Sequence, residues 1–319
     1  MPTPFYSTVQ RLCALLLLSG GLFVTAVSHA QLLSAPQVLR ESQFDYKTLT
    51  PATSTPIFLA QANTEGAARF TFVGDNALGD PFNPTIVAIY VRALALPTTY
   101  MYKTIAPANT VAAFIAQLNT EAALGYRYFG DQIYAGVIAS VLVKESTNAA
   151  YHYKGLTPAT TSAAFFALVN SEGALGYQFQ GDIGVDTGGG NFVFSSLFSR
   201  NTVAPTTYSY ESAPILESAA ALVTQANAQG ARNFVYRGGI SFSNGAFEIF
   251  SLYEKDNARG DTFRYEQLPR SATSASFLSQ LNAQGARRFS YFGDIAFANS
   301  EIASLYASVA PILVTGFEN

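Results

Sequence analysis

Apolar residues along this chain follow two periodicities that recur in a fixed order. Segments such as residues 100–103 carry an aromatic residue at every second position, as a β-strand with one apolar and one polar face does. A stretch rich in Pro, Ser and Thr follows, and then Val111, Phe114, Ile115 and Leu118 recur at the spacing of one helical face. A second alternating segment and a third, largely apolar one complete the cycle. The pattern predicts a β-α-β-β unit, with the polar face of its first strand in solvent.

This cycle of about 55 residues occurs five times. In each copy a tyrosine on the first predicted strand precedes, by 17 residues, an asparagine near the end of the predicted helix. The tyrosines are Tyr46, Tyr102, Tyr153, Tyr210 and Tyr265, and the asparagines are Asn63, Asn119, Asn170, Asn227 and Asn282. Length varies only in the loop after the second strand, which is typical of a tandem structural repeat.

We therefore predict an α+β fold of five tandem βαββ repeats, each a three-stranded sheet covered by one short helix. The repeats span residues 44–99, 100–150, 151–207, 208–262 and 263–309, between a linker at 31–43 and a tail at 310–319. The third strand, apolar on both faces, is expected inside its sheet or against a neighbouring unit. One unit is small for independent stability, so neighbours are expected to share a core. The sequence leaves open whether the array is open or closes into a ring.

Glycine recurs three residues after the asparagine in four copies, at Gly66, Gly173, Gly230 and Gly285, whereas copy two has Ala122. Glycine at the end of a helix commonly adopts the left-handed conformation of a C-cap. We therefore expect these four helices to end at their glycines.

Residues 1–30 have the features of a secretory signal peptide. Arg11 is their only charged residue, an apolar run follows it, and Ser28-His29-Ala30 resembles a cleavage site. We predict that the chain is secreted, to the periplasm or the cell exterior, with no transmembrane segment in the mature chain. The one cysteine, Cys13, lies in this signal, so the mature chain is predicted to be cysteine-free and to form no disulfides or thiolate metal sites.

Charge excludes one class of partner. Removing the signal loses Arg11 and no acidic residue, so the net charge moves from −3 to −4. A weakly acidic chain lacks the basic surface that nucleic-acid binding requires, and we expect no nucleic-acid partner.

One short motif in each unit resembles a known family. Residues 118–126, Leu-Asn-Thr-Glu-Ala-Ala-Leu-Gly-Tyr, are similar to the L-N-x-x-G-A-x-G-aromatic signature of small bacterial βαββ domains of unknown function. Copies three and five carry related segments at 170–177 and 281–286. The family usually has Trp at the aromatic position, and this chain has no Trp. The resemblance supports the βαββ fold and implies no activity.

The best-placed polar residues are the aspartates of four Gly-Asp pairs, Asp75, Asp131, Asp182 and Asp294, with Gly239 at this position in copy four. Carboxylates near Asp186 and Asn191, or near Asp80 and Asn83, suggest a Ca²⁺ site. The favoured interpretation is structural, because glycine permits a turn and aspartate hydrogen-bonds to nearby backbone.

Aromatic residues in the predicted variable loops are the stronger candidates for contact with a partner, because exposed aromatic residues mark interaction surfaces. These residues are Phe82, Tyr134, Phe192, Phe242 and Phe247.

No residue set points to catalysis, and no copy stands out by gaining acid-base residues. His152, the only histidine after residue 30, has no evident catalytic partner. We predict no catalytic, cofactor-binding or metal-binding residues and no cofactor. The expected function is a non-catalytic interaction or structural role with an unknown protein or glycan partner. The alternative is a glycan- or cell-wall-binding module that uses the loop aromatics.

Overall fold

The computed structural model describes residues 42–80, 83–146, 149–242 and 247–310, which form five helices and fifteen strands. The predicted signal peptide and the end of the tail lie outside these residues. Unit 1 contains β1 (Phe44–Leu49), α3 (Thr55–Ala67), β2 (Thr71–Leu78) and β3 (Thr85–Ala93). Unit 2 contains β4 (Tyr100–Ile105), α4 (Val111–Ala123), β5 (Arg127–Tyr134) and β6 (Val137–Glu145). Unit 3 contains β7 (Tyr151–Leu156), α5 (Ser162–Ala174), β8 (Gln178–Gly188) and β9 (Asn191–Asn201). Unit 4 contains β10 (Tyr208–Pro214), α6 (Ala219–Gly230), β11 (Val235–Phe242) and β12 (Glu248–Asp256). Unit 5 contains β13 (Thr262–Pro269), α7 (Ser274–Ala286), β14 (Ser290–Ala296) and β15 (Ile302–Ala310).

Each unit has the same sheet. Its third strand lies in the centre and pairs antiparallel with the first and second strands, giving the order β1-β3-β2 in unit 1 and its equivalent in the other four. The α+β fold of five βαββ repeats and the central position of the third strand are thus confirmed. All the pairings are antiparallel. The helix returns the chain so that the second strand runs in the same direction as the first, one strand position away, and the hairpin then places the third strand between them in the opposite direction.

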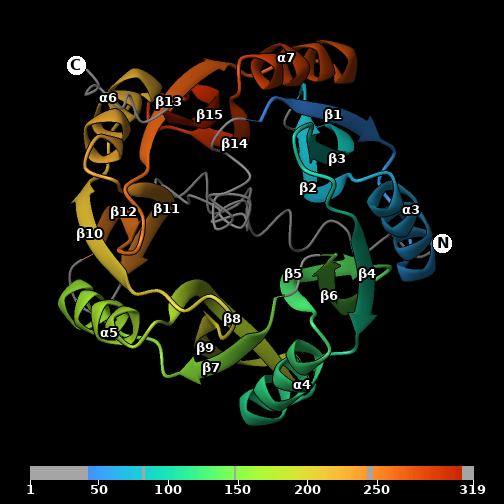
Figure 1. Ribbon diagram of the computed structural model, residues 1–319, viewed down its shortest axis with the longest axis vertical. Helices are drawn as coiled ribbons and strands as arrows, with labels where there is room; N and C mark the ends of the chain where they lie inside the picture. Colours follow the sequence, from blue (N-terminus) through green and yellow to red (C-terminus); the bar gives the residue numbers. More distant parts are fainter. Residues whose placement is uncertain (1–41, 81–82, 147–148, 243–246, 311–319) are drawn as a thin grey trace, which may run out of the picture.

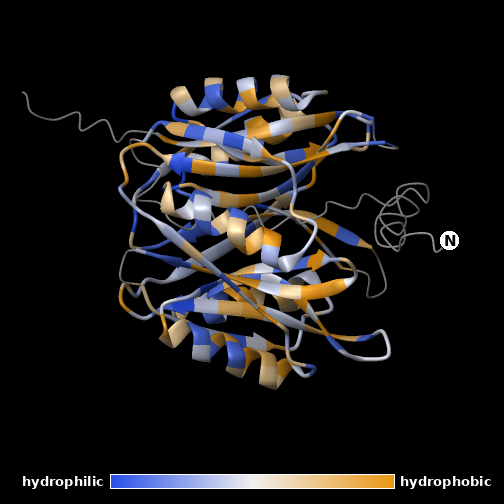
Figure 2. Ribbon diagram, turned by 90° about the vertical axis from the view of Figure 1, so that its right-hand side faces the viewer, coloured by the Kyte–Doolittle hydropathy of each residue, from blue (hydrophilic) through white to orange (hydrophobic). Residues whose placement is uncertain are grey.

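The five units close into a ring, with the helices at its outer edge (Figure 1). Each helix packs against the first strand of the following unit, as α3 does on β4, and α7 packs in the same way on β1. The units are joined at one end of the ring, which we call the linker end. At the other end, the hairpin end, the second strand of each unit turns into the third, and the long β8–β9 hairpin projects from the body (Figure 2).

Each helix is shared between two sheets, which differs from the single covered sheet expected for each unit. Phe58 of α3 contacts Phe72 of its own sheet, with ring centroids 5.2 Å apart, and Tyr102 of the next sheet, at 6.1 Å. All three side chains are buried in one cluster together with Val141 and Val143 of unit 2. The predicted sharing of a core between neighbours is therefore confirmed, and the core lies between units.

The repeated asparagine and tyrosine join each pair of units. Asn63 Oδ1 accepts a hydrogen bond from the backbone N of Tyr102 at 2.7 Å, and Asn63 Nδ2 donates to the Tyr102 carbonyl at 3.1 Å. Because the asparagine bonds to the N–H and C=O of one residue, it fixes the position of the next strand relative to the helix. Corresponding pairs of bonds link Asn119 to Tyr153, Asn170 to Tyr210, Asn227 to Tyr265 and Asn282 to Tyr46.

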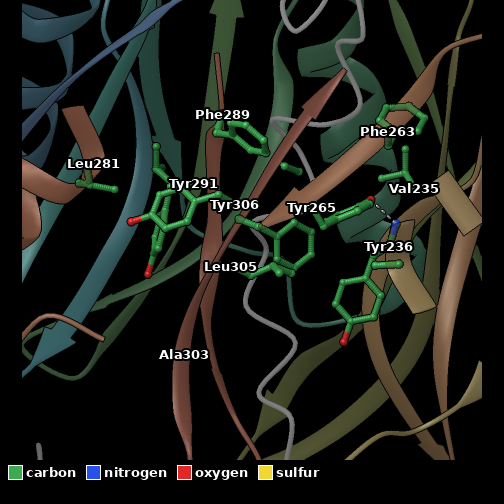
Figure 3. Packing of buried hydrophobic residues seen from close by; sticks show 14 of the residues in the cluster. Val235, Tyr236, Phe263, Tyr265, Leu281, Phe289, Tyr291, Ala303, Leu305 and Tyr306 are labelled. Atoms are coloured by element: carbon green, nitrogen blue, oxygen red, sulfur yellow. Dashed lines mark hydrogen bonds between the residues drawn. The ribbon is translucent and has the colours of Figure 1, made fainter. Parts of the chain in front are cut away.

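The tyrosine hydroxyl returns this contact. Tyr102 Oη accepts a hydrogen bond from the backbone N of Phe72, on the second strand of the preceding unit, at 2.7 Å. Tyr265 does the same with Tyr236 at 2.8 Å (Figure 3). Burial raises the pKa of the Tyr102 phenol to about 12, so the group stays protonated at physiological pH.

The repeated glycines serve packing between units. Only α6 ends at its glycine, Gly230, and none of the four glycines has the left-handed conformation predicted for a C-cap. A Cβ on Gly66 would lie 2.2 Å from the carbonyl oxygen of Tyr100 in the next unit, so only glycine lets the helix approach this closely. The helix continues to Ala67, and the left-handed residue is Arg69, three positions after the glycine, with φ of 72°. The same left-handed position in the other units is occupied by Gly125, Gly176, Asn233 and Arg288.

The polar face of the first strand is in solvent only in part. Met101, His152 and Arg264 on this face are exposed, as expected, whereas the residue two positions further along each strand pairs with the end of the unit's own helix. Lys154 Nζ on β7 donates to Glu172 on α5 at 2.7 Å, and the Glu172 side chain is only 9% exposed. Units 1 and 2 contain the same pair, Lys47 with Glu65 and Lys103 with Glu121. In units 4 and 5 the charges are exchanged, as Glu211 pairs with Arg232 and Glu266 with Arg287.

Candidate functional site

Four positions at the linker end of each sheet distinguish some units from others. Two of them are the first and third residues of the second strand. The other two lie on the third strand: one pairs with the first residue of the second strand, and the other pairs with a residue at the start of the first strand. We call them the junction positions. In unit 5 they hold Ser290, Phe292, Ala307 and Val309, and in unit 1 Thr71, Val73, Val91 and Ala93. Most of these side chains are apolar and buried, and they belong to a core that runs through units 4, 5 and 1.

The same positions are mostly polar in the three other units. Unit 2 has Arg127, Phe129, Val143 and Glu145; unit 3 has Gln178, Gln180, Ser199 and Asn201; unit 4 has Val235, Arg237, Glu254 and Asp256. One side of the ring thus carries a polar cluster where the opposite side carries core. The difference is visible in the sequence when the residues at the same junction position are compared across the five repeats. It was missed above because each copy was searched only for acid-base residues.

Part of this polar cluster is deeply buried. The side chains of Arg237 and Glu254 are 6% and 7% exposed, with Nε and Oε2 3.6 Å apart. Gln178 of unit 3 donates from Nε2 to Glu254 Oε1 at 2.6 Å, and Arg237 Nη2 donates to the carbonyl of Phe179 at 3.1 Å. Charges removed from water reduce stability unless each is well compensated, so this is a costly way to join two units. Units 5 and 1 show that the fold itself has no need of it.

A cavity of about 200 Å³ opens beside these buried groups. Units 2, 3 and 4 all contribute to it, and its walls combine arginine, tyrosine, amide and hydroxyl side chains. The side chains that line it include Arg127, Tyr151, Gln178, Gln180, Tyr208, Asp256 and Arg259.

The charged groups in the cavity wall differ in how many of their polar atoms have a hydrogen-bond partner. Asp256 Oδ1 accepts hydrogen bonds from the Thr206 hydroxyl and, at 3.0 Å, from the backbone N of Ala258, while its Oδ2 lies 3.1 Å from Arg259 Nε. Among the described residues, Arg259 Nη1 is buried and has no hydrogen-bond partner. Burial, and then the nearby Glu254 and Asp256 carboxylates, raise the pKa of the Tyr208 phenol, which therefore remains a hydrogen-bond donor.

The Gly-Asp pairs of units 1, 2, 3 and 5 occupy a β-bulge, where the sequence predicted a turn, and Gly238-Gly239 occupy the equivalent bulge of unit 4. Register shifts between Phe179 and Gly181, and Gly181 has φ of 122°, a conformation that favours glycine. The Asp182 carboxylate accepts a hydrogen bond from Ser196 on the central strand at 2.6 Å, and Asp131 and Asp294 are bonded in the same way to Ser140 and Ser304. These contacts support the structural interpretation. In the part of the chain that the structure describes, no group of three or more His, Cys, Asp or Glu side chains is placed to hold a metal ion.

Asp75 lacks such a serine, because its partner on the central strand is Ala88. Asp75 is an exposed residue by its accessible surface, yet the protein around its carboxyl removes enough water to raise the pKa to about 6.

The five predicted loop aromatics have different fates. Tyr134 and Phe242 are buried against the preceding unit, so these two are core residues and not contact residues. Phe192 and Phe247 are exposed, at 48% and 59%, and Phe82 lies outside the described residues.

Exposed apolar side chains gather at the hairpin end. Of the thirteen large hydrophobic residues that are exposed in the described ranges, seven lie in or next to the hairpins of units 2 to 5: Ile133, Val137, Phe192, Val193, Phe194, Phe247 and Ile302. Three of them are consecutive on β9, so both faces of the projecting β8–β9 hairpin are apolar.

His152 lies on the exposed face of β7, and its Nδ1 is 2.9 Å from the Tyr177 hydroxyl. No helix within the described ranges is both long enough and apolar enough to span a membrane.

Comparison of the chain with protein-family models, with curated proteins and with solved structures finds no match in any of the three. The resemblance to small bacterial βαββ domains stays a prediction.

Proposed function

We propose that this chain is a secreted, non-catalytic binding protein whose hairpin end contacts a partner at the periplasmic or extracellular side of the cell. The observation that carries the proposal is the exposed row Phe192-Val193-Phe194 on β9, in which each side chain is at least 48% exposed. Large apolar side chains in a contiguous exposed patch are typical of surfaces that meet another molecule. The ring beneath them is held at every junction by the same asparagine–tyrosine contacts, which favours a stable platform over a moving catalytic site.

A glycan is the second candidate partner, and the placement of two aromatic rings favours it. Phe192 and Phe194 lie on one face of β9, and both rings approach the position that a Cβ on Gly184 would occupy, at 3.4 and 3.2 Å. The missing side chain at Gly184 lets the two rings lie close to the neighbouring strand. An exposed apolar surface of this kind suits the apolar face of a sugar ring.

Co-sedimentation with peptidoglycan and a panel of insoluble polysaccharides tests both candidates. The variant Phe192→Ser/Phe194→Ser removes the aromatic rings, and Leu175→Ser, which changes a side chain that is 59% exposed at the end of α5, is the matched control. Saturable binding that only the double variant loses supports a glycan partner. If no polymer binds, affinity capture with the same three proteins follows, and a partner retained equally by the double variant would contradict the use of the hairpin end.

A further inference from the structure

The polar junction positions of units 2, 3 and 4 call for a functional explanation. Five copies of one unit meet at five equivalent junctions, so the residues of units 5 and 1 show what the fold alone requires at these positions. Those residues are mainly apolar, whereas the other side of the ring buries Arg237 and Glu254 and leaves a cavity beside them. Polar groups kept in a buried place at a cost to stability are typical of binding sites.

The hydrogen-bonding balance of the cavity indicates the charge of its ligand. The one carboxylate in its wall, Asp256, is already bonded to Thr206, Ala258 and Arg259. Two guanidinium groups, those of Arg127 and Arg259, also line the cavity, and a guanidinium can only donate. Cationic donors therefore outnumber carboxylates in the wall and favour a ligand that brings acceptors, above all a carboxylate, which arginine binds with strong charge-assisted hydrogen bonds.

The size and remaining lining of the cavity limit the body of the ligand. A volume of about 200 Å³ is below the roughly 300–1,000 Å³ of pockets for drug-sized molecules, so the ligand is about as large as one sugar or one amino acid. The tyrosines at 151 and 208 and the amides at 178 and 180 can both donate and accept, which suits hydroxyl or amide groups.

We propose that the cavity formed by units 2, 3 and 4 at the linker end binds a small carboxylate that carries hydroxyl or amide groups, with Arg259 as its main anchor. This site is separate from the apolar hairpin end, and it does not depend on the partner proposed there.

Isothermal titration of the purified protein with three probes tests the proposal. D-glucuronate supplies a carboxylate on a sugar, L-glutamate supplies one on an amino acid, and D-glucose has no carboxylate. We expect at least one of the two carboxylates to bind saturably with one site per chain, and glucose to bind at least tenfold more weakly. The tighter carboxylate identifies the source of the ligand. Absence of binding by both, or equal binding of glucose, would overturn the proposal.

Two variants locate the binding. Arg259→Gln is expected to weaken carboxylate binding at least tenfold, whereas Arg264→Gln, which removes the same charge from an exposed position on β13, leaves it unchanged. Gln180→Phe installs the residue found at this junction position in units 2 and 5 (Phe129 and Phe292) and should fill the cavity.

Gln180→Phe should therefore abolish binding, and because two other units carry phenylalanine here it should not lower the melting temperature. This variant tests the location of the site even if Arg259→Gln fails to fold. Carboxylate binding that survives in a folded Gln180→Phe protein would mean an adventitious site elsewhere and would contradict the proposal. The Phe192→Ser/Phe194→Ser protein is expected to bind the carboxylate normally.

Discussion

The side-chain amide of Asn282 bonds to the backbone of Tyr46, a residue 236 positions earlier in the chain. Oδ1 accepts from the Tyr46 N–H at 2.8 Å, and Nδ2 donates to its carbonyl at 3.4 Å. The hydroxyl of Tyr46 in turn accepts from the backbone N of Tyr291 at 2.8 Å. These contacts repeat those of the four other junctions, so the ring closes without any special element.

Removing the closing amide should weaken the ring. Asn282→Ala loses two partly buried hydrogen bonds, and at a net contribution of roughly 1 kcal/mol each we expect the free energy of unfolding to fall by about 2 kcal/mol. Asn227→Ala is the matched control, because it removes the equivalent bonds to Tyr265 at an internal junction. Denaturant unfolding measures both. A change below about 0.5 kcal/mol in Asn282→Ala would contradict the role of this contact in closure.

A methyl group at the closest approach between units should be destabilising. The Cβ of Gly285→Ala would lie 2.2 Å from the Phe44 carbonyl oxygen, so α7 must move away from β1. We expect a loss of about 2 kcal/mol, even though alanine favours helix by about 1 kcal/mol relative to glycine. Gly260→Ala is the control, since a Cβ there meets nothing within 4 Å. Thermal unfolding that ranks the two variants equally would argue against the close approach.

Ala122 shows that the junction between units 2 and 3 is built around a methyl group, so its neighbours should tolerate one.

The exchanged charges in units 4 and 5 predict that stability lost by breaking the Lys154–Glu172 pair can be restored by installing the unit 4 arrangement in unit 3. Lys154→Gln leaves the nearly buried Glu172 carboxylate without its cation and should cost about 1 kcal/mol, a modest value because Lys154 itself is a third exposed. The triple variant Lys154→Glu/Glu172→Gln/Leu175→Arg reproduces the arrangement of Glu211, Gln229 and Arg232 in unit 4. We expect it to restore the melting temperature of the parent protein. A triple variant less stable than Lys154→Gln would show that the two arrangements are not interchangeable.

Asp75 should give stability a dependence on pH near 5. Its pKa is raised from 3.8 to about 6 by burial, so the folded protein favours the protonated carboxyl. The stabilisation is complete below pH 3.8 and is lost as the pH rises through about 6. Asp75→Asn should remove this dependence between those values, as measured by denaturant unfolding at several pH values.

Supplying the missing serine tests the cause. Ala88→Ser places a hydroxyl opposite Asp75. At Asp182, where burial also raises the pKa, the equivalent bond from Ser196 offsets part of that rise. The pKa of Asp75, followed by carbon-detected NMR, should therefore fall in Ala88→Ser. An unchanged pKa would mean that the serine bond is not what separates Asp75 from the other bulge aspartates.

The repeat made the fold of one unit predictable, because alternation and helical spacing report on which face of an element is buried. It could not reveal ring closure, since the pattern of each unit is the same whether the last unit meets the first or meets solvent. The role of Gly66 and its equivalents was mistaken for the same reason. A glycine at a helix end fits a C-cap locally, and only the carbonyl of Tyr100 in the next unit explains it.

Tyr134 and Phe242 were assigned to loops because they follow the variable point of the repeat, yet the second strand continues through both. The bulge at the Gly-Asp pair interrupts the alternation, which hid this continuation. The polar cluster was missed because its residues were considered one copy at a time. Gln180 is unusual only in comparison with Phe129 and Phe292, the apolar residues at the same position in units 2 and 5.

Sharing each helix between two sheets has a consequence for the order in which the protein is made. The helix that packs on β1 and Tyr46 is α7, whose Asn282 lies 236 residues later in the chain. The first sheet therefore waits with an uncovered aromatic face until α7 has been synthesised. A chain interrupted before residue 274 should expose that face, and a chaperone or protease able to recognise it would distinguish unfinished rings from finished ones.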